Sequence, residues 1–224
     1  GDSLEGRSRG DQAGWSVSMS ASSNVIALGA PGSSSGYTRV YEWSGNRWVQ
    51  RGKDIENGDR SGHSIGLNGD GSTLAIGAID GSYVKVYQYN GSNWRGRGQP
   101  IKGDESTYFG ASVSLSKSGD ILAVGAPYDT KVRSGSAAGL ARVYVWDNGR
   151  WIQQGQDLNG AGSFHYFGQY VTLSNSGQVL AVGAPGPRWG DVPSSIFVYD
   201  WDSSERSWML RGNQISSGDS SSYG

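Results

Sequence analysis

The feature that most constrains the fold of this chain is a phrase that occurs four times. The copies read GWSVSMSASSNVIALGAP (residues 14–31), GHSIGLNGDGSTLAIGAI (62–79), FGASVSLSKSGDILAVGAP (109–127) and FGQYVTLSNSGQVLAVGAP (167–185). Copies that recur in phase along 224 residues indicate a repeat protein, in which each unit folds alike and packs on its neighbours.

Each unit predicts four short strands. Residues 112–116 alternate apolar and polar side chains, which predicts a strand with one buried face. A turn leads to 121–124, a run that is apolar on both faces and therefore predicts a buried central strand. Residues 142–146 predict the third strand, and a tight Asn/Asp-Gly type of turn leads to the fourth. The fourth strand is opened in successive units by Trp48, Trp94, Trp151 or Trp208.

Four antiparallel strands in a unit of about 50 residues are typical of a β-propeller blade, so we predict an all-β propeller. The Gly-Ala pairs that end the second strands, such as 125–126, suit the crowded inner part of a blade. The Tyr and Trp residues of the third and fourth strands are expected to fill the wider space between neighbouring blades.

We interpret residues 1–224 as a single propeller region. Its blades are expected at approximately 14–61, 62–108, 109–166 and 167–215, with 1–13 and 216–224 belonging to adjoining units. Two arrangements remain open: four blades that close a small ring, or four blades of a larger, six- to eight-bladed ring. An open arc would expose long sheet faces, which folded proteins avoid, so we favour the larger ring and expect the remaining blades of the same parent protein as a partner.

Composition excludes several classes of protein. Thirty-seven Gly residues could indicate a linker, but nine Trp and twelve Tyr indicate a packed, turn-rich fold. The formal charge of −1 and the scattered Lys and Arg give no basic stripe, so no nucleic-acid partner is expected. No apolar run approaches the ~20 residues of a membrane span, so no membrane insertion is expected. The chain has no cysteine.

The repeat also carries a family resemblance. FGASVSLSKSGDILAVGAP followed by ARVYVW resembles the FG-GAP repeats of integrin α-chain propellers, in the variant without a calcium loop that is found in secreted and surface proteins. Trp15, His63 and Ile79 depart from the motif. The integrin-type repeat has a D-x-D-x-D-G loop where this chain has SASSN, NGDGS, SKSGD and SNSGQ. These turns lack the six to eight oxygen ligands that calcium needs, so we expect no metal and no cofactor. The resemblance implies an extracellular or cell-surface location.

Two long loops mark the expected binding face. Extra length falls between the second and third strands, at 128–139 and 186–195, and both loops should emerge at the same end of the propeller. The alternative is that they are solvated loops without a ligand. The candidate ligand-binding residues in them are Tyr128, Asp129, Lys131, Arg133, Arg188, Trp189 and Asp191.

Other motifs are weaker signals. The tripeptide RGD at 9–11 could indicate adhesion, but Asp11 recurs as a loop aspartate and is better explained as the cap of a turn. His63 and His165 are far apart and are interpreted as structural, so no catalytic residue is assigned. Asn90 opens a glycosylation sequon that coincides with a predicted hairpin turn.

These observations predict a non-catalytic extracellular module that binds a protein or a glycan or is built into a structural assembly. A carbohydrate-binding lectin is the alternative, because exposed aromatic side chains next to Asp and Asn suit sugar faces. A propeller hydrolase is a third hypothesis, which no group of residues in the sequence supports.

Overall fold

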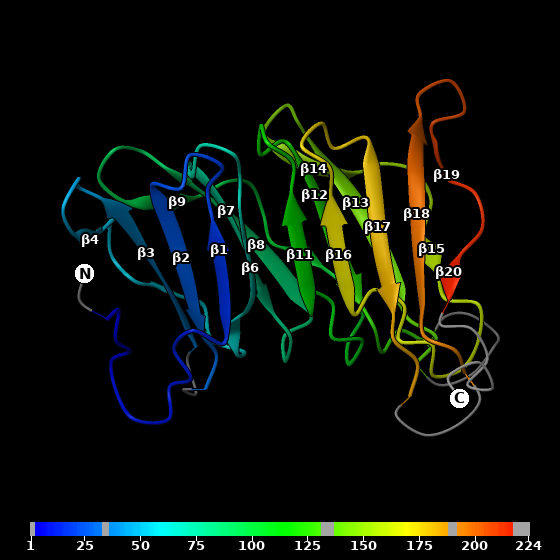
Figure 1. The fold of residues 1–224 in the computed structure, drawn as a ribbon, viewed down its shortest axis with the longest axis horizontal. Helices are drawn as coiled ribbons and strands as arrows, with labels where there is room; N and C mark the ends of the chain where they lie inside the picture. The colour runs from blue at the N-terminus through cyan, green and yellow to red at the C-terminus, as the bar shows by residue number, and fades with distance from the viewer. Residues whose placement is uncertain (1–2, 33–35, 131–136, 188–191, 217–224) are drawn as a thin grey trace, which may run out of the picture.

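The computed structural model describes residues 3–32, 36–130, 137–187 and 192–216. These residues form strands and turns and no helix, and hence no helix that could span a membrane. The strands make four antiparallel sheets in chain order (Figure 1). The predicted all-β fold of four repeated sheets is therefore confirmed.

The four sheets share one topology, in which the first four strands pair in sequence. Sheet one contains β1 (Ser16–Met19), β2 (Val25–Ala30), β3 (Tyr37–Trp43), β4 (Trp48–Gln50) and β5 (Ile55–Glu56). Sheet two contains β6 (Ser61–Leu67), β7 (Thr73–Ala78), β8 (Tyr83–Tyr89), β9 (Trp94–Gly96) and β10 (Ile101–Lys102). Sheet three contains β11 (Ser112–Leu115), β12 (Ile121–Ala126), β13 (Leu140–Asp147), β14 (Arg150–Gln153) and β15 (Leu158–Asn159). Sheet four contains β16 (Tyr170–Leu173), β17 (Val179–Ala184), β18 (Ser195–Asp202), β19 (Ser207–Leu210) and β20 (Ile215–Ser216).

The sequence analysis missed the fifth strand of each sheet. It has two residues and pairs with the beginning of the third strand, as Ile55 does with Thr38 and Leu158 with Ala141. A pair of residues is too short to show the alternation that identifies a strand. Its first residue is buried in sheets one to three, so this strand closes the outer edge of the core.

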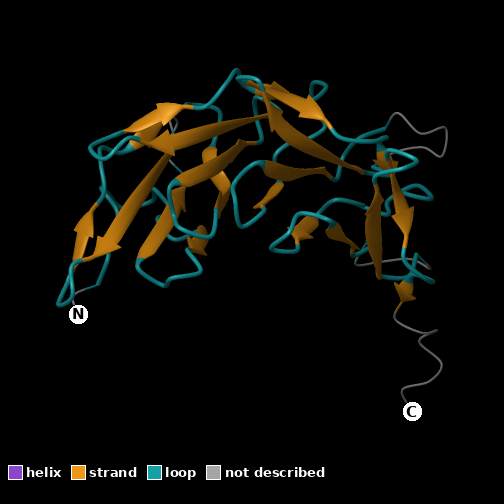
Figure 2. Cartoon of the chain, turned by 90° about the horizontal axis from the view of Figure 1, so that it is seen from above, coloured by secondary structure: helices purple, strands orange, loops and turns teal. Residues whose placement is uncertain are grey.

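The core lies between successive sheets. Figure 2 shows the sheets one after another along an open arc, with the two ends of the chain at opposite ends of it. One buried cluster joins sheets one and two, a second joins two and three, and a third joins three and four. Val124 is fully buried in the second cluster, as expected for a central strand that is apolar on both faces.

Three kinds of hydrogen bond repeat at each junction between sheets. A serine hydroxyl at the start of the inner strand donates to the motif glycine carbonyl of the next sheet: Ser16 to Gly62, Ser64 to Gly110 and Ser112 to Gly168, at 2.6–2.8 Å. A backbone amide in the inner turn donates to the equivalent turn ahead: Ala21 to Gly69, Gly69 to Lys117 and Lys117 to Asn175, each at 2.9 Å. The indole Nε1 of the outer strand donates backward to a carbonyl: Trp94 to Arg51, Trp151 to Arg97 and Trp208 to Gln154, at 2.8–3.0 Å.

These contacts explain the repeated residues. The serines of the inner strand, which the alternation placed on a solvated face, are buried at Ser64 and Ser112 because the next sheet covers them. Trp94, Trp151 and Trp208 lie between sheets, as predicted. A Cβ on Gly125 would lie 1.9 Å from the Gly168 carbonyl oxygen, so the glycine of the Gly-Ala pair allows the sheets to approach.

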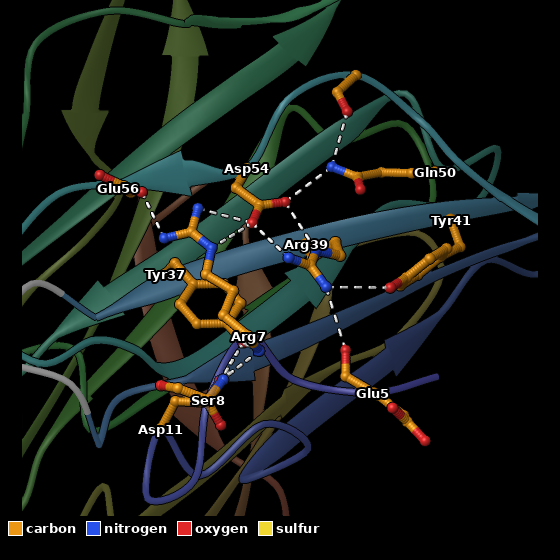
Figure 3. A network of polar contacts seen from close by, with 11 residues as sticks. Glu5, Arg7, Ser8, Asp11, Tyr37, Arg39, Tyr41, Gln50, Asp54 and Glu56 are labelled. Atoms are coloured by element: carbon orange, nitrogen blue, oxygen red, sulfur yellow. Dashed lines mark hydrogen bonds and ion pairs between the residues drawn. The ribbon is translucent and has the colours of Figure 1, made fainter. Parts of the chain in front are cut away.

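The N-terminal segment is fixed to sheet one by charged groups. Figure 3 shows the Asp54 carboxylate between the guanidinium groups of Arg7 and Arg39, with Nε to oxygen distances of 2.7 and 2.8 Å. Sheet three repeats the main pair as Arg142 and Asp157, joined by two bonds of 2.7 Å. Because the pair recurs at equivalent positions, we assign it to the architecture of the sheets.

Asp11 caps the turn that contains the RGD tripeptide. Its carboxylate accepts hydrogen bonds from the amides of Arg7, Ser8 and Ala13 and from the hydroxyl of Tyr37, at 2.6–3.2 Å. The side chain is 5 % exposed. The interpretation of Asp11 as a structural cap is confirmed, and its carboxylate is not presented on the surface.

We expect the free energy of unfolding to fall in acid because of Asp11. The Tyr37 hydrogen bond, followed by the backbone amides, lowers the pKa of Asp11 from 3.8 to about 2. A lowered pKa in the folded state stabilises the fold above the unfolded value, and this contribution disappears as the pH falls from about 4 to about 2. Urea unfolding across that range should show the decline. Asp11→Asn should be less stable at neutral pH and should show a smaller decline; an equal decline in both proteins would contradict the assignment.

Candidate functional site: a tyrosine cleft between sheets three and four

The most distinctive surface feature is a row of aromatic side chains at one end of sheets three and four. The ring centroids of Tyr108 and Tyr128 are 4.8 Å apart, and those of Tyr128 and Tyr166 are 5.4 Å apart. Phe164 continues the row, 6.4 Å from Tyr166. Tyr108, Tyr128 and Phe164 are 38–45 % exposed, so the row faces solvent.

The row borders a cleft of about 680 Å³. This volume lies within the range of small-ligand sites. Residues from the loop entering sheet four, from the start of β16 and from the β17–β18 loop meet here with Tyr128 of the β12–β13 loop. The lining residues are Tyr128, Tyr166, Gln169, Tyr170, Pro185, Gly186, Pro187 and Ser194. We call this set the tyrosine cleft.

The backbone of the repeat presents two of these tyrosines. The residue two places before the motif glycine has a positive φ in every unit: 59° at Gln12, 53° at Arg60, 55° at Tyr108 and 52° at Tyr166. A left-handed conformation costs free energy for a residue with a side chain, so the surrounding turn must enforce it. The turn is thus common to all units, whereas a tyrosine at this position distinguishes sheets three and four.

The tyrosine hydroxyls can donate hydrogen bonds at neutral pH. Burial raises the pKa of Tyr128, and the neighbouring Tyr166 and Tyr108 raise it further. The group is therefore protonated well above neutrality. With the amide of Gln169 and the hydroxyl of Ser194, the cleft offers neutral donors and acceptors beside apolar rings.

In the structure, described residues from both of the long loops that the sequence analysis singled out line one cleft. Tyr128 from the first long loop lines the same cleft as residues 185–187 and Ser194, which lie at the two ends of the second. Asp129 is buried, with 2 % of its surface exposed, and its backbone closes the loop through Gly139. The remaining candidates, Lys131, Arg133, Arg188, Trp189 and Asp191, lie outside the described residues.

The sequence analysis did not single out Tyr108, Phe164, Tyr166, Gln169 and Tyr170. The signal was present in the alignment of the repeats, where Tyr108 and Tyr166 replace Gln12 and Arg60 two places before the glycine. Predicting that this position faces outward, however, required knowledge of the left-handed turn.

The other predicted positions have structural surroundings. His63 is half-buried and its ring lies 5.7 Å from that of Trp15; burial lowers its pKa, as it does for His165. Asn90 is exposed in the β8–β9 turn, where its Oδ1 accepts hydrogen bonds from the amides of Ser92 and Asn93. Across the described ranges, no three His, Cys, Asp or Glu side chains gather as they would to hold a metal ion.

A second hollow lies where the inner turns of the sheets converge. Its volume is about 840 Å³, and its lining comes from the inner turns of all four sheets, including Ala21, Gly69, Lys117 and Asn175. Backbone amides and carbonyls in this lining bond the turns to one another. Because it lacks an aromatic side chain among its described lining residues, it offers a ligand fewer apolar contacts than the tyrosine cleft.

Comparison with known proteins identifies the fold. No protein-family model and no curated protein sequence matches the chain. Among solved structures, hydrazine synthase from Kuenenia stuttgartiensis is similar with a TM-score of 0.63 and 11 % identity, over 97 % of this chain and 53 % of that one. A 6-phosphogluconolactonase candidate from Bacteroides uniformis gives 0.63 and 12 %, over 90 % and 54 %. TolB from Acinetobacter baumannii gives 0.53 and 13 %, over 90 % and 42 %.

These similarities show a β-propeller fold, and at such low identity they show the fold alone. The chain spans about half the length of the propellers it matches. They include hydrazine synthase, a 6-phosphogluconolactonase candidate and TolB, and a shared fold does not by itself assign a function to this chain.

Proposed function

We propose that this chain is a non-catalytic binding module of an extracellular or cell-surface propeller of the FG-GAP type, and that its tyrosine cleft binds a carbohydrate. The observation that carries the proposal is the row of Tyr108, Tyr128 and Tyr166 beside a cleft with neutral hydrogen-bonding groups. The repeated FG-GAP-like phrase supports the family and, through it, the location.

The chemistry of the cleft suits a sugar. One face of a pyranose carries C–H bonds with a slight positive charge, which is attracted to the negative face of an aromatic ring. Its hydroxyl groups need donors and acceptors at the edge of that ring. Gln169, Ser194 and the tyrosine hydroxyls supply both.

The lining favours binding over bond cleavage. Hydrolysis of a glycosidic bond commonly uses two carboxyl groups on opposite sides of the bond. The described residues that line the cleft are aromatic, amide, hydroxyl, proline and glycine groups. Such groups can position a ligand through stacking and hydrogen bonds.

Replacement of Tyr128 tests the proposal. A glycan array should identify a bound oligosaccharide, and calorimetry should then show that Tyr128→Ala weakens its binding by about tenfold or more, because the central ring of the row is lost. Tyr128→Phe should retain most of the affinity if stacking dominates. Trp15→Ala removes an exposed ring from sheet one, outside the cleft, and should bind like the parent.

A folding control and two binding outcomes decide whether the proposal holds. Melting curves of Tyr128→Ala should resemble those of the parent, because the side chain is 42 % exposed. A parent protein that retains no glycan, or a Tyr128→Ala variant that binds as tightly as the parent, would contradict the proposal. Binding of a protein ligand at the same cleft without glycan binding would contradict the carbohydrate assignment.

A further inference from the structure

The chain carries one sequon for N-glycosylation, Asn90-Gly91-Ser92. No other asparagine in the sequence is followed two places later by serine or threonine. In secreted proteins such a sequon is the acceptor for an oligosaccharide on the asparagine side chain. Short sequons also occur by chance, so the surroundings of Asn90 in the fold decide whether it can carry a sugar chain.

The fold places this sequon at the tip of a hairpin. β8 and β9 pair antiparallel, and residues 90–93 connect them. The amide of Asn90 donates to the Asn93 carbonyl at 3.1 Å and closes the turn. Asn90, Gly91 and Ser92 are all exposed, and a Cβ on Gly91 would meet no atom within 4 Å. The tip therefore has open space around it for a large substituent.

The Asn90 side chain is held through its oxygen. Oδ1 accepts hydrogen bonds from the amide and the hydroxyl of Ser92, both at 3.1 Å, and from the amide of Asn93 at 2.9 Å. Nδ2 has no hydrogen-bond partner among the described residues. Because Nδ2 is the atom that carries the sugar of an N-glycan, attachment leaves every hydrogen bond of the folded turn in place.

The sequon and the tyrosine cleft lie at opposite ends of the sheets. The inner turns of successive sheets bond to one another, so the four sheets are oriented alike. Strands that neighbour each other run antiparallel, so the connections alternate between the two ends. Asn90 lies between a third and a fourth strand, whereas Tyr128 and Ser194 of the cleft lie between second and third strands. A sugar chain on Asn90 therefore extends away from the cleft.

We propose that Asn90 is an N-glycosylation site, whose sugar chain covers the end of the sheets opposite the tyrosine cleft. The inference rests on the extracellular location in the proposed function and not on the binding of a glycan at the cleft. In the reaction, Nδ2 replaces the diphosphate of a lipid-linked oligosaccharide at C1 of its first sugar. The bond from C1 to the diphosphate oxygen breaks, the bond from Nδ2 to C1 forms, and the lipid diphosphate leaves. One amide proton passes to a base of the transferase.

The sugar chain also stands beside an edge strand. Among the described residues, β9 pairs with β8 alone, so its other edge has no strand partner. An unpaired edge is a site where another chain can add a strand, and a bulky, solvated substituent next to it obstructs that addition. We therefore expect a protein partner to bind at the end that holds the cleft rather than along the outer hairpin of sheet two.

Mass spectrometry of the chain secreted from a eukaryotic host tests the site. A glycopeptide that contains Asn90 should be found. Peptide N-glycosidase should release the sugar from the folded protein, and leave aspartate at that position, because the sequon is at an exposed tip. Ser92→Ala and Asn90→Gln should each remove the sugar chain, whereas Ser92→Thr should retain it. The three variants should fold like the parent, since the replaced side chains are exposed.

Binding of the oligosaccharide selected on a glycan array separates this inference from the proposed function. The protein should bind it equally tightly before and after release of the Asn90 sugar chain, because the two sites lie at opposite ends. A chain that binds no oligosaccharide would contradict the proposed function alone, since the glycopeptide decides this inference by itself. Unmodified Asn90, a sugar chain retained in Ser92→Ala or resistant to release from the folded protein, or weaker binding at the cleft while the sugar chain is attached would overturn the inference.

Discussion

Replacing Val124 by aspartate is expected to destabilise the fold by about 4 kcal/mol or more, because the new carboxylate would be buried without a partner. Val124 is fully buried between sheets two and three, in a cluster that includes Leu122, Phe109 and Val84. This loss is a large part of the total stability of an ordinary domain. Urea or thermal unfolding should show a protein that is largely unfolded or melts far below the parent.

The matched control is the same substitution at an exposed valine. Val17 also lies in a strand, β1 of sheet one, but it is 65 % exposed. Val17→Asp should therefore leave the unfolding free energy within about 1 kcal/mol of the parent value. Equal stability of Val124→Asp and the parent would show that the central strand of sheet three has been placed wrongly.

Replacing Gly125 by alanine should cost about 3 kcal/mol, although the change adds only one methyl group. The new Cβ would lie 1.9 Å from the carbonyl oxygen of Gly168 and 2.4 Å from the hydroxyl of Ser112. The first contact is with backbone, so the sheets themselves must move apart. Separation would also break the Ser112 to Gly168 hydrogen bond.

Gly183 provides the internal control for this prediction. It is the equivalent glycine of sheet four, and a Cβ there would meet only Tyr170, at an ordinary distance of 3.4 Å. Gly183→Ala should therefore change stability by less than about 1 kcal/mol. Chemical unfolding of both variants gives the comparison. Similar losses for the two would mean that the close approach of sheets three and four does not determine the requirement for glycine.

Much of the fold could be predicted from the sequence because the repeat provides four independent copies of one pattern. The alternation at 112–116 and the apolar run at 121–124 correspond to β11 and β12. Trp94, Trp151 and Trp208 lie between the sheets, as their size suggested. Local periodicity and residue volume were sufficient for these assignments.

The remaining features depend on contacts between units. Ser64 and Ser112 are buried because the next sheet covers them and accepts their hydrogen bonds, which an alternating pattern in one strand does not reveal. The two-residue fifth strands are fixed by pairing with a distant strand and carry no period of their own.

Only part of the candidate site could be predicted. The two long loops of the sequence each contribute to the lining of one cleft, through Tyr128 and Ser194, and their role in binding stays a prediction. Tyr108 and Tyr166 were missed because their outward direction depends on a left-handed backbone at an ordinary-looking position. Asp129 had the polarity expected of a ligand-binding residue, but the folded loop buries it.

The measurement that tests the account most directly is an NMR titration of the chain with the oligosaccharide selected on a glycan array. The account predicts that amide shifts concentrate at Tyr128, Tyr166, Gln169 and Ser194, and that Tyr128→Ala strongly reduces them at a ligand concentration near the Kd of the parent. The inner-turn amides of Gly69 and Lys117 should not respond. Shifts concentrated at those inner turns, or no saturable shift at the tyrosine cleft, would contradict it.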